Sequence, residues 1–192
     1  MTLPVLTERL VVREYTMSDL DDVLAVIGDA RVFWWRARPY GRVGARAWLD
    51  EAITFAREHD IGRYAVQLRD SAAGPSAYRG RVIGGVSLLP REFDGRVEVE
   101  IGWHMAGDLW GRGYATEAGA ALMREARRRG LRRLVSFIMP GNVQSRRVAE
   151  KLGLRLEGEV QWASRPHELW RVELGARQES GATSSRAGKY VR

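Results

Sequence analysis

Apolar and polar residues alternate along this chain with two different periods, which predict strands and helices in turn. Short runs that are rich in β-branched residues or alternate with period two predict strands at 10–13, 63–68, 82–89, 97–103 and 134–139, with two further β-prone stretches near 156 and at 169–174. Apolar residues spaced three and four apart predict helices at 20–27, 45–59, 116–129 and 143–152. The order is that of a mixed α/β fold.

Breaks in the pattern indicate how these elements connect. An Asp-Gly pair at 94–95 joins two predicted strands, which favours an antiparallel meander across 63–103. The segment 29–44 is rich in aromatic residues and reads as a loop between two helices. We expect a single domain over residues 1–175 and a disordered tail over 176–192, because the tail is rich in Ser, Gly and Ala without apolar periodicity.

The composition excludes several kinds of chemistry. A chain of 192 residues can bury a core as one domain. It has no cysteine and three scattered histidines, so we expect no disulfide, no thiolate chemistry and no metal site. No apolar run is long enough to span a membrane, and the first residues do not read as a signal peptide. We therefore expect a cytoplasmic protein that does not bind a membrane.

The charge is +7, from 31 basic and 24 acidic residues, and favours anionic ligands. Six arginines lie within the segment 124–133, at the end of a predicted helix. Cations at that position match the helix dipole, which explains the cluster without a ligand. The alternative is a nucleic-acid patch, although no aromatic residues interleave with these arginines.

A glycine-containing turn follows the strand at 97–103 and leads into a helix. It reads Leu-Trp-Gly-Arg-Gly-Tyr-Ala-Thr-Glu from 109 to 117. Gly111 and Gly113 allow close backbone approach, so successive N–H groups could face an anion at the positive end of the helix. An ordinary glycine turn explains the same residues, and Glu117 brings a negative charge there. The segment alone leaves both interpretations open.

A second informative segment, at 140–154, follows the strand at 134–139. Asn142 stands where a helix N-cap is expected and Gly153 where that helix should stop. Taken alone, the segment is a capped helix.

Together, the two segments resemble the GNAT acyltransferases, and most closely the branch of the ribosomal-protein N-terminal acetyltransferases. The resemblance rests on Gly-Arg-Gly-Tyr-Ala-Thr-Glu and, some thirty residues later, on Asn-x-x-Ser followed by Glu-Lys-Leu-Gly. Thr-Glu-Arg-Leu-Val-Val-Arg at 7–13, Ile-Gly-Gly at 83–85 and Leu-Glu-Gly at 156–158 extend it to about residue 174. It implies an α/β fold whose mostly antiparallel sheet splays at a cofactor cleft and is flanked by helices.

The resemblance also implies acetyl-CoA as the cofactor, without a metal, between the strands at 97–104 and 134–139. Backbone groups would hold the pantetheine arm at Ile101, Gly102, Trp103, His104 and Met105. The pyrophosphate would lie at Trp110, Gly111, Arg112, Gly113, Tyr114, Ala115 and Thr116, with Arg112 as a phosphate partner. Asn142 and Ser145 would lie near the thioester. The chain departs from the family pattern at two positions. Trp110 stands where many members have Gln or Arg, and Ala149 stands where many have a tyrosine. Because the hydroxyl of that tyrosine is often assigned to protonate the CoA thiolate, this role would pass to Ser145 or to water.

Two carboxylates in the strand at 97–103 are the candidate catalytic bases. Glu98 and Glu100 are two residues apart and should point to one face of the strand. Neighbouring carboxylates beside an apolar cleft could raise one pKa toward neutrality, which suits a general base. The alternative is that at least one carboxylate only decorates a solvated face. His104 extends the same face if no bulge intervenes, whereas a bulge beside the cleft would reorient it; of the two, we favour a surface histidine.

The loop at 29–44 is expected to face the acceptor. Trp34, Trp35 and Tyr40 are candidate substrate-binding residues, and packing in the core is the alternative for each. Arg36 and Arg38 could attract an acidic substrate or could face solvent.

These observations predict an acetyl-CoA-dependent N-acetyltransferase. Its acceptor would be a primary amine, either on a protein N-terminus or on a small molecule, and would attack directly in a ternary complex. Two alternatives remain: a non-catalytic acyl-CoA-binding or regulatory module of the same fold, and a basic nucleic-acid-binding protein. An open sheet edge would need a cover, and a homodimer is one way to supply it.

Overall fold

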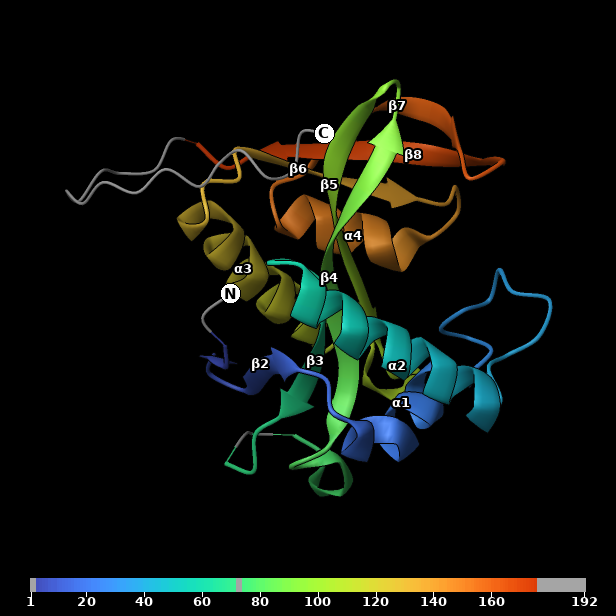
Figure 1. Cartoon of the computed structure of the whole chain (residues 1–192), viewed down its shortest axis with the longest axis vertical. Helices are drawn as coiled ribbons and strands as arrows, with labels where there is room; N and C mark the ends of the chain where they lie inside the picture. The colour runs from blue at the N-terminus through green and yellow to red at the C-terminus, as the bar shows by residue number, and fades with distance from the viewer. Residues whose placement is uncertain (1–2, 72–73, 176–192) are drawn as a thin grey trace.

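The protein is built around one eight-stranded sheet with helices on both faces (Figure 1). The computed structural model describes residues 3–71 and 74–175. The strands follow the order β1-β2-β3-β4-β5-β6-β8-β7. The tail predicted at 176–192 lies outside the described residues.

The elements follow the predicted order. The strands are β1 (Val5–Leu6), β2 (Leu10–Glu14), β3 (Arg63–Leu68), β4 (Val82–Phe93), β5 (Arg96–Met105), β6 (Arg133–Ile138), β7 (Arg155–Trp162) and β8 (Arg165–Glu173). The helices are α1 (Leu20–Ile27), α2 (Arg42–Glu58), α3 (Tyr114–Arg128) and α4 (Val143–Lys151), with short 3-10 turns at Met17–Asp19, Ser76–Tyr78 and Gly107–Leu109. The mixed α/β prediction is confirmed.

Several boundaries differ from the prediction. Helix α2 begins at Arg42 instead of residue 45, and α3 begins at Tyr114 instead of residue 116. Strands β4 and β5 are longer than predicted and form an extended hairpin. Its turn contains Asp94 and Gly95, both with positive φ (51° and 70°), a conformation that Gly and Asp adopt more readily than other residues. The short edge strand β1 was not predicted.

Two apolar clusters attach the helices to the sheet. Helices α1 and α2 pack on one face around residues such as Ile27 and Leu49, together with Ala65 of β3. Helices α3 and α4 contribute to the other, larger cluster, which includes Leu122 and Ala149 with strand residues such as Ile101. None of the helices in the described part of the chain combines the length and apolarity of a membrane span.

Strand pairing divides the sheet into two parts. Among the described strands, every neighbouring pair is antiparallel except β5 and β6, which are parallel. Strands β4 and β5 pair along ten positions, whereas β5 and β6 share one position, Glu100 with Val135. The predicted splay therefore lies between β5 and β6, and it positions the site described next.

Candidate functional site

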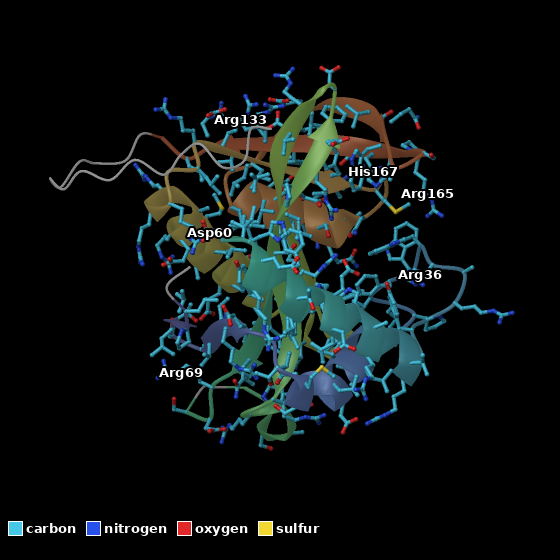
Figure 2. All side chains as sticks on the ribbon, viewed as in Figure 1. Arg36, Asp60, Arg69, Arg133, Arg165 and His167 are labelled. Carbon is cyan, nitrogen blue, oxygen red and sulfur yellow. The ribbon has the colours of Figure 1, made fainter. Side chains whose placement is uncertain are left out.

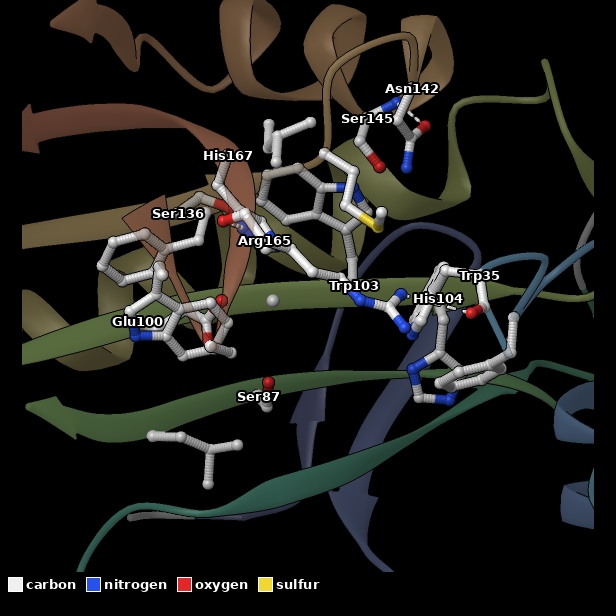
Figure 3. Close-up of a pocket in the computed structure, with 18 of the residues that line it drawn as sticks. Trp35, Ser87, Glu100, Trp103, His104, Ser136, Asn142, Ser145, Arg165 and His167 are labelled. Carbon is white, nitrogen blue, oxygen red and sulfur yellow. Dashed lines mark hydrogen bonds between the residues drawn. The ribbon is translucent and has the colours of Figure 1, made fainter. Parts of the chain in front are cut away.

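A cavity of about 930 Å³ lies where β5 and β6 separate (Figure 3). Glu100, Gly102, Trp103 and His104 line it from β5, and residues 136–139 line it from β6 and the turn that follows. The loop between α1 and α2 and the β7–β8 hairpin contribute further walls. Its volume is that of a typical small-molecule site.

The residues predicted to hold a pantetheine arm divide between the core and the cavity. Ile101 and Met105 point into the core, with 0% and 4% of their surface exposed. Gly102, Trp103 and His104 line the cavity. The carbonyl of Met105 already accepts a hydrogen bond from Nε1 of Trp110 (2.9 Å), so this carbonyl has a partner within the protein.

The glycine turn has the conformation that its sequence predicts. Gly111 and Gly113 have φ values of +77° and +82°, in the left-handed region that favours glycine. Gly113 occupies the N-cap position of α3, and no side chain caps the helix. The N–H of Glu117 donates to the carbonyl of Gly113 (3.0 Å), which is the first hydrogen bond of the helix. The N–H groups of residues 114–116 come before it and therefore have no acceptor within the helix. This helix end can receive an anion.

The other residues of this turn are held by protein contacts. The carbonyl of Arg112 accepts a hydrogen bond from Arg9 (2.9 Å), and the buried ring of Tyr114 lies under the Arg9 guanidinium. Trp110 is partly exposed. Among the described residues, those lining the cavity do not include 110–116. A ligand reaching both places must therefore extend beyond the cavity.

The negative charge of Glu117 is compensated within the protein. Its carboxylate forms an ion pair with Arg9 (2.7 Å) and also accepts hydrogen bonds from the Thr7 hydroxyl and the Arg9 N–H. Burial raises the pKa of Glu117, but these hydrogen bonds outweigh burial and hold the pKa below its ordinary value. The paired carboxylate opposes an anion at this helix end less than an isolated one would.

Asn142 and Ser145 meet at the start of α4 (Figure 3). Oδ1 of Asn142 accepts a hydrogen bond from the N–H of Ser145 (3.1 Å), which confirms Asn142 as the N-cap. Both residues line the cavity. Gly153 ends the helix with a φ of +82°, as its sequence position predicts. The cap thus brings an amide and a hydroxyl to the cavity wall.

The two candidate bases occupy different environments. Glu98 is 2% exposed and pairs with Arg133 (2.9 Å) and Arg171 (3.4 Å), which belong to β6 and β8. Glu100 lines the cavity and pairs with Nε of Arg91 (2.7 Å). The cavity-lining residues described here do not include Glu98.

The prediction of a surface position for His104 is wrong. Strands β4 and β5 keep their register through His104 without a bulge, so its side chain stays on the cavity face of the strand. The ring packs against Phe33 and Trp48, with centroids 5.6 and 5.8 Å apart. Burial and, to a smaller extent, the charge of Arg63 together lower the pKa of His104 to about 4, so the ring is neutral at neutral pH.

Of the three candidate substrate-binding residues, one, Trp35, lines the cavity. Trp34 is 49% exposed, and Tyr40 packs against Phe33 and under the Arg36 guanidinium. Among the described residues, neither Trp34 nor Tyr40 is part of the cavity lining.

Part of the cavity wall comes from residues that the sequence patterns do not mark as a site. Phe33 and Trp48 come from the α1–α2 region, and Trp162, Arg165 and His167 come from the β7–β8 hairpin. The hairpin residues lie far along the chain from the glycine turn, and no spacing links them to it. The Trp-Ala-Ser-Arg-Pro-His run at 162–167 was the available signal, since it concentrates aromatic and basic residues at a turn.

The arginine cluster at 124–133 is largely engaged in internal contacts. Arg128 pairs with Glu125, Arg129 donates to the carbonyl of Asp60, and Arg133 pairs with Glu98. At least three of the six arginines are therefore held by contacts within the protein. Among the described residues no group of His, Asp and Glu side chains could hold a metal ion.

Comparison with known proteins identifies relatives in sequence and in fold. The chain is 32% identical to YkkB of Bacillus subtilis over 88 residues, which are 45% of this chain and 51% of YkkB, so this match spans about half the length of that relative. It is 26% identical to the N-acetyltransferase YnaD of Bacillus subtilis over 154 residues, 79% of this chain and 82% of YnaD.

A solved structure and a family model extend the comparison. The structure of RimL, a ribosomal L7/L12 alpha-N-protein acetyltransferase in complex with coenzyme A, superposes with a TM-score of 0.71 at 18% identity, covering 88% of this chain and 97% of RimL. This likeness shows a shared fold. The model of the acetyltransferase (GNAT) domain matches residues 9–155. Because that match spans well over half of the chain and includes the whole glycine turn and the α4 cap, the chain belongs to the GNAT acetyltransferase family.

Proposed function

We propose that this protein transfers the acetyl group of acetyl-CoA to a primary amine, on a protein N-terminus or on a small molecule, by direct attack in a ternary complex. The cavity at the β5–β6 separation carries the proposal. It combines two strands that no longer pair with each other, an amide and a hydroxyl at the α4 cap, and one carboxylate.

The residues at the site suit acetyl-CoA. A pantetheine arm carries amide groups, which can pair with strand backbone where β5 and β6 lack each other as partners. Its pyrophosphate suits the uncapped N-terminus of α3, where the N–H groups of 114–116 precede the helical ladder and the helix dipole favours negative charge. The fold shared with RimL, whose structure holds coenzyme A, supports the same assignment.

The transfer requires the amine to be neutral when it attacks. The amine nitrogen forms a bond to the thioester carbonyl carbon, the carbon–sulfur bond breaks, and the sulfur leaves with the bonding electron pair. The nitrogen loses one proton, and we assign its acceptance to Glu100 or to a water held by it. The Ser145 hydroxyl, on the first turn of α4, is our candidate to give a proton to the departing sulfur and then to regain one from solvent.

The ion pair between Glu100 and Arg91 favours one alternative function. The Glu100 carboxylate already accepts a hydrogen bond from Nε of Arg91 at 2.7 Å, an arrangement that a non-catalytic acyl-CoA-binding module would allow. Such a module would bind acetyl-CoA and acetylate no amine. Release of free CoA in the presence of amines therefore separates the two functions.

The first experiment is the shift in melting temperature with acetyl-CoA, CoA, ATP and NAD at matched concentrations. A ligand that binds the folded state raises the melting temperature by mass action. We expect acetyl-CoA and CoA to raise it and NAD to leave it unchanged. No shift with either CoA compound would contradict the proposal, and a shift followed by amine-dependent CoA release would support it fully.

A further inference from the structure

The charged side chains lining the cavity are strongly unbalanced in sign. Five arginines contribute to the lining, from the α1–α2 loop, β3, β4 and β8, whereas Glu100 is the one acidic side chain among the described lining residues. These arginines are Arg36, Arg38, Arg63, Arg91 and Arg165. Because His104 is neutral at neutral pH, it adds no charge.

Two of the five arginines already have carboxylate partners. Arg91 pairs with Glu100 (2.7 Å), and Arg63 pairs with Glu51 (3.0 Å). The ion pairs formed by residues 3–71 and 74–175 do not include Arg36, Arg38 or Arg165. Three guanidinium groups thus line the cavity without an acidic partner.

The uncompensated arginines belong to two segments that meet at the cavity. Nη1 of Arg165 donates to the carbonyl of Trp35 (3.3 Å), which joins the β7–β8 hairpin to the α1–α2 loop. Arg36, the next residue along the loop, has its guanidinium 4.0 Å from the centre of the Tyr40 ring. Figure 2 shows Arg36 and Arg165 on the same side of the molecule, and Figure 3 shows the Arg165 side chain extending across the cavity toward Trp35.

These positions set opposite requirements for the two ends of an acceptor. A guanidinium group matches a carboxylate or phosphate in charge and geometry, and its attraction is strengthened in a concave, partly apolar site. The same positive charge repels an ammonium group and lowers its pKa, which favours the neutral amine that attack requires. The amine should therefore lie toward Glu100 and the anion toward Arg36 and Arg165.

We infer that the acceptor is a primary amine that also carries an anionic group, a carboxylate or a phosphate, which Arg36 and Arg165 bind from the loop and the hairpin. Aromatic side chains of Trp35 and Trp103 line the cavity with them and suit an apolar body between the two polar ends. This inference rests on the proposed function and specifies its substrate class. The anion can belong to a small acid or to an acidic residue next to a peptide N-terminus.

The test compares amines that differ only in the anion. One pair is 4-(2-aminoethyl)benzoate and its carboxamide; the other is a pair of short peptides, Ser-Glu-Ala-Ala and Ser-Gln-Ala-Ala, both amidated at the C-terminus. CoA release gives kcat/KM for each. We expect the acidic member of at least one pair to be favoured by tenfold or more, about 1.4 kcal/mol. The pair that shows the preference distinguishes a small acid from a peptide.

Variants connect the preference to the named residues. The double substitution Arg36→Gln and Arg165→Gln should reduce the ratio of the two kcat/KM values toward one. The matched control is Arg79→Gln with Arg155→Gln, which removes the same charge from two exposed arginines outside the cavity lining and should leave the ratio unchanged. Arg165→Lys should retain more of the preference than Arg165→Gln, because lysine keeps the positive charge although it lacks the planar, bidentate guanidinium group.

The outcomes separate failure of this inference from failure of the proposed function. Equal rates for acidic and neutral amines, with acetyl-CoA bound and acetyl transferred, would overturn the inference alone. A loss of acetyl-CoA affinity in the Arg36 and Arg165 double variant, as large as the loss in kcat/KM, would also overturn it, because the arginines would then serve the cofactor. No acetyl-CoA binding and no transfer to any amine would overturn both.

Discussion

At the scale of single residues, two carboxylates separated by one position in β5 have different environments. Glu98 is enclosed by arginines of β6 and β8, and Glu100 faces the cavity. A strand of period two puts both on one face, but arginine side chains from β6 and β8 contact Glu98 there, whereas the face opens to the cavity at Glu100, the one position where β5 pairs with β6. Identical side chains therefore suit different roles.

Replacing Glu100 tests its role as base. Glu100→Gln should lower kcat by roughly 100-fold or more, because an amide cannot accept the amine proton, and should leave acetyl-CoA affinity nearly unchanged. Steady-state CoA release and calorimetric titration measure the two effects. Unchanged turnover would remove Glu100 from the mechanism.

Glu98→Gln is the matched comparison at the buried position. It leaves two arginines with a neutral partner, so we expect the free energy of unfolding to fall by roughly 1–3 kcal/mol in denaturant titration. The kcat of the folded variant should decrease much less than that of the Glu100 variant. A kcat loss equal to that of Glu100→Gln would return Glu98 to the list of candidate bases.

His104 gives a prediction about pH. Burial lowers its pKa to about 4 in the folded protein, whereas an unfolded chain has the ordinary value near 6.5. The unfolded state therefore binds more protons between these values, and stability falls as pH decreases from about 6.5 to about 4. The contribution is at most about 3 kcal/mol.

Denaturant titration from pH 7 to pH 4 checks this dependence. In His104→Gln the loss of stability over that range should be smaller than in the unmodified protein. His59→Gln, which removes a histidine from an exposed position, is the control and should follow the unmodified protein. Parallel pH profiles for all three proteins would show that His104 titrates normally.

At the scale of elements, the two ends of α3 allow a matched experiment on the glycine turn. Gly113 precedes the helix and Gly130 follows it, with φ values of +82° and +83°. A valine at either position is strained by a similar amount, on the order of 1–2 kcal/mol or more. Only the first position belongs to the proposed pyrophosphate site.

Gly113→Val should therefore abolish the melting-temperature shift with acetyl-CoA, because the turn can no longer present its N–H groups to the pyrophosphate. Gly130→Val should lower the melting temperature of the free protein similarly and keep the shift. Thermal unfolding with and without acetyl-CoA measures both. If the two variants respond alike to acetyl-CoA, the turn does not contact the cofactor.

The turn of the β7–β8 hairpin stores strain beside the cavity. Ala163 and Ser164 have φ values of 50° and 60°, and Trp162 pairs with Arg165 directly around them. Positive φ at both central positions is the type I′ geometry, which favours Asn-Gly. Replacing Ala163-Ser164 with Asn-Gly should raise the free energy of unfolding by about 1 kcal/mol or more in denaturant titration. A decrease would mean that Ala163 packing in the cavity wall outweighs the strain.

The secondary-structure elements also show which features local sequence patterns predict and which depend on long-range packing. Local signals were sufficient for the order of helices and strands, for the glycine turn and for the Asn142 cap, since each depends on residues close together in the chain. The position of His104 and the hairpin residues Trp162 and Arg165 depends on long-range pairing. Exposure of Trp34 beside buried Val32 depends on how one loop packs, which periodicity does not describe.

At the scale of the whole molecule, the eight-stranded sheet has two parts that pair at one backbone position, Glu100 with Val135. Strands β1 to β5 come from the first part of the chain and β6 to β8 from the last, and residues 106–132 make the connection between them. Helix α3 lies within this connection and packs against the larger core. The two parts are thus held together by helix packing, by one paired backbone position, and by side-chain contacts such as the ion pairs of Glu98 with Arg133 and Arg171.

This discontinuity predicts how amide hydrogens exchange with solvent water. Amides of β5 and β6 that face the gap have no strand partner, so they should exchange faster than amides paired with β4 or β8. A ligand that bridges the gap would slow exchange on both strands together. Deuterium uptake at residues 101–105 and 136–138 that is unaffected by acetyl-CoA would contradict this. Slower uptake at both segments when acetyl-CoA is bound would mean that the cofactor joins the two parts of the sheet into one continuous hydrogen-bonded surface.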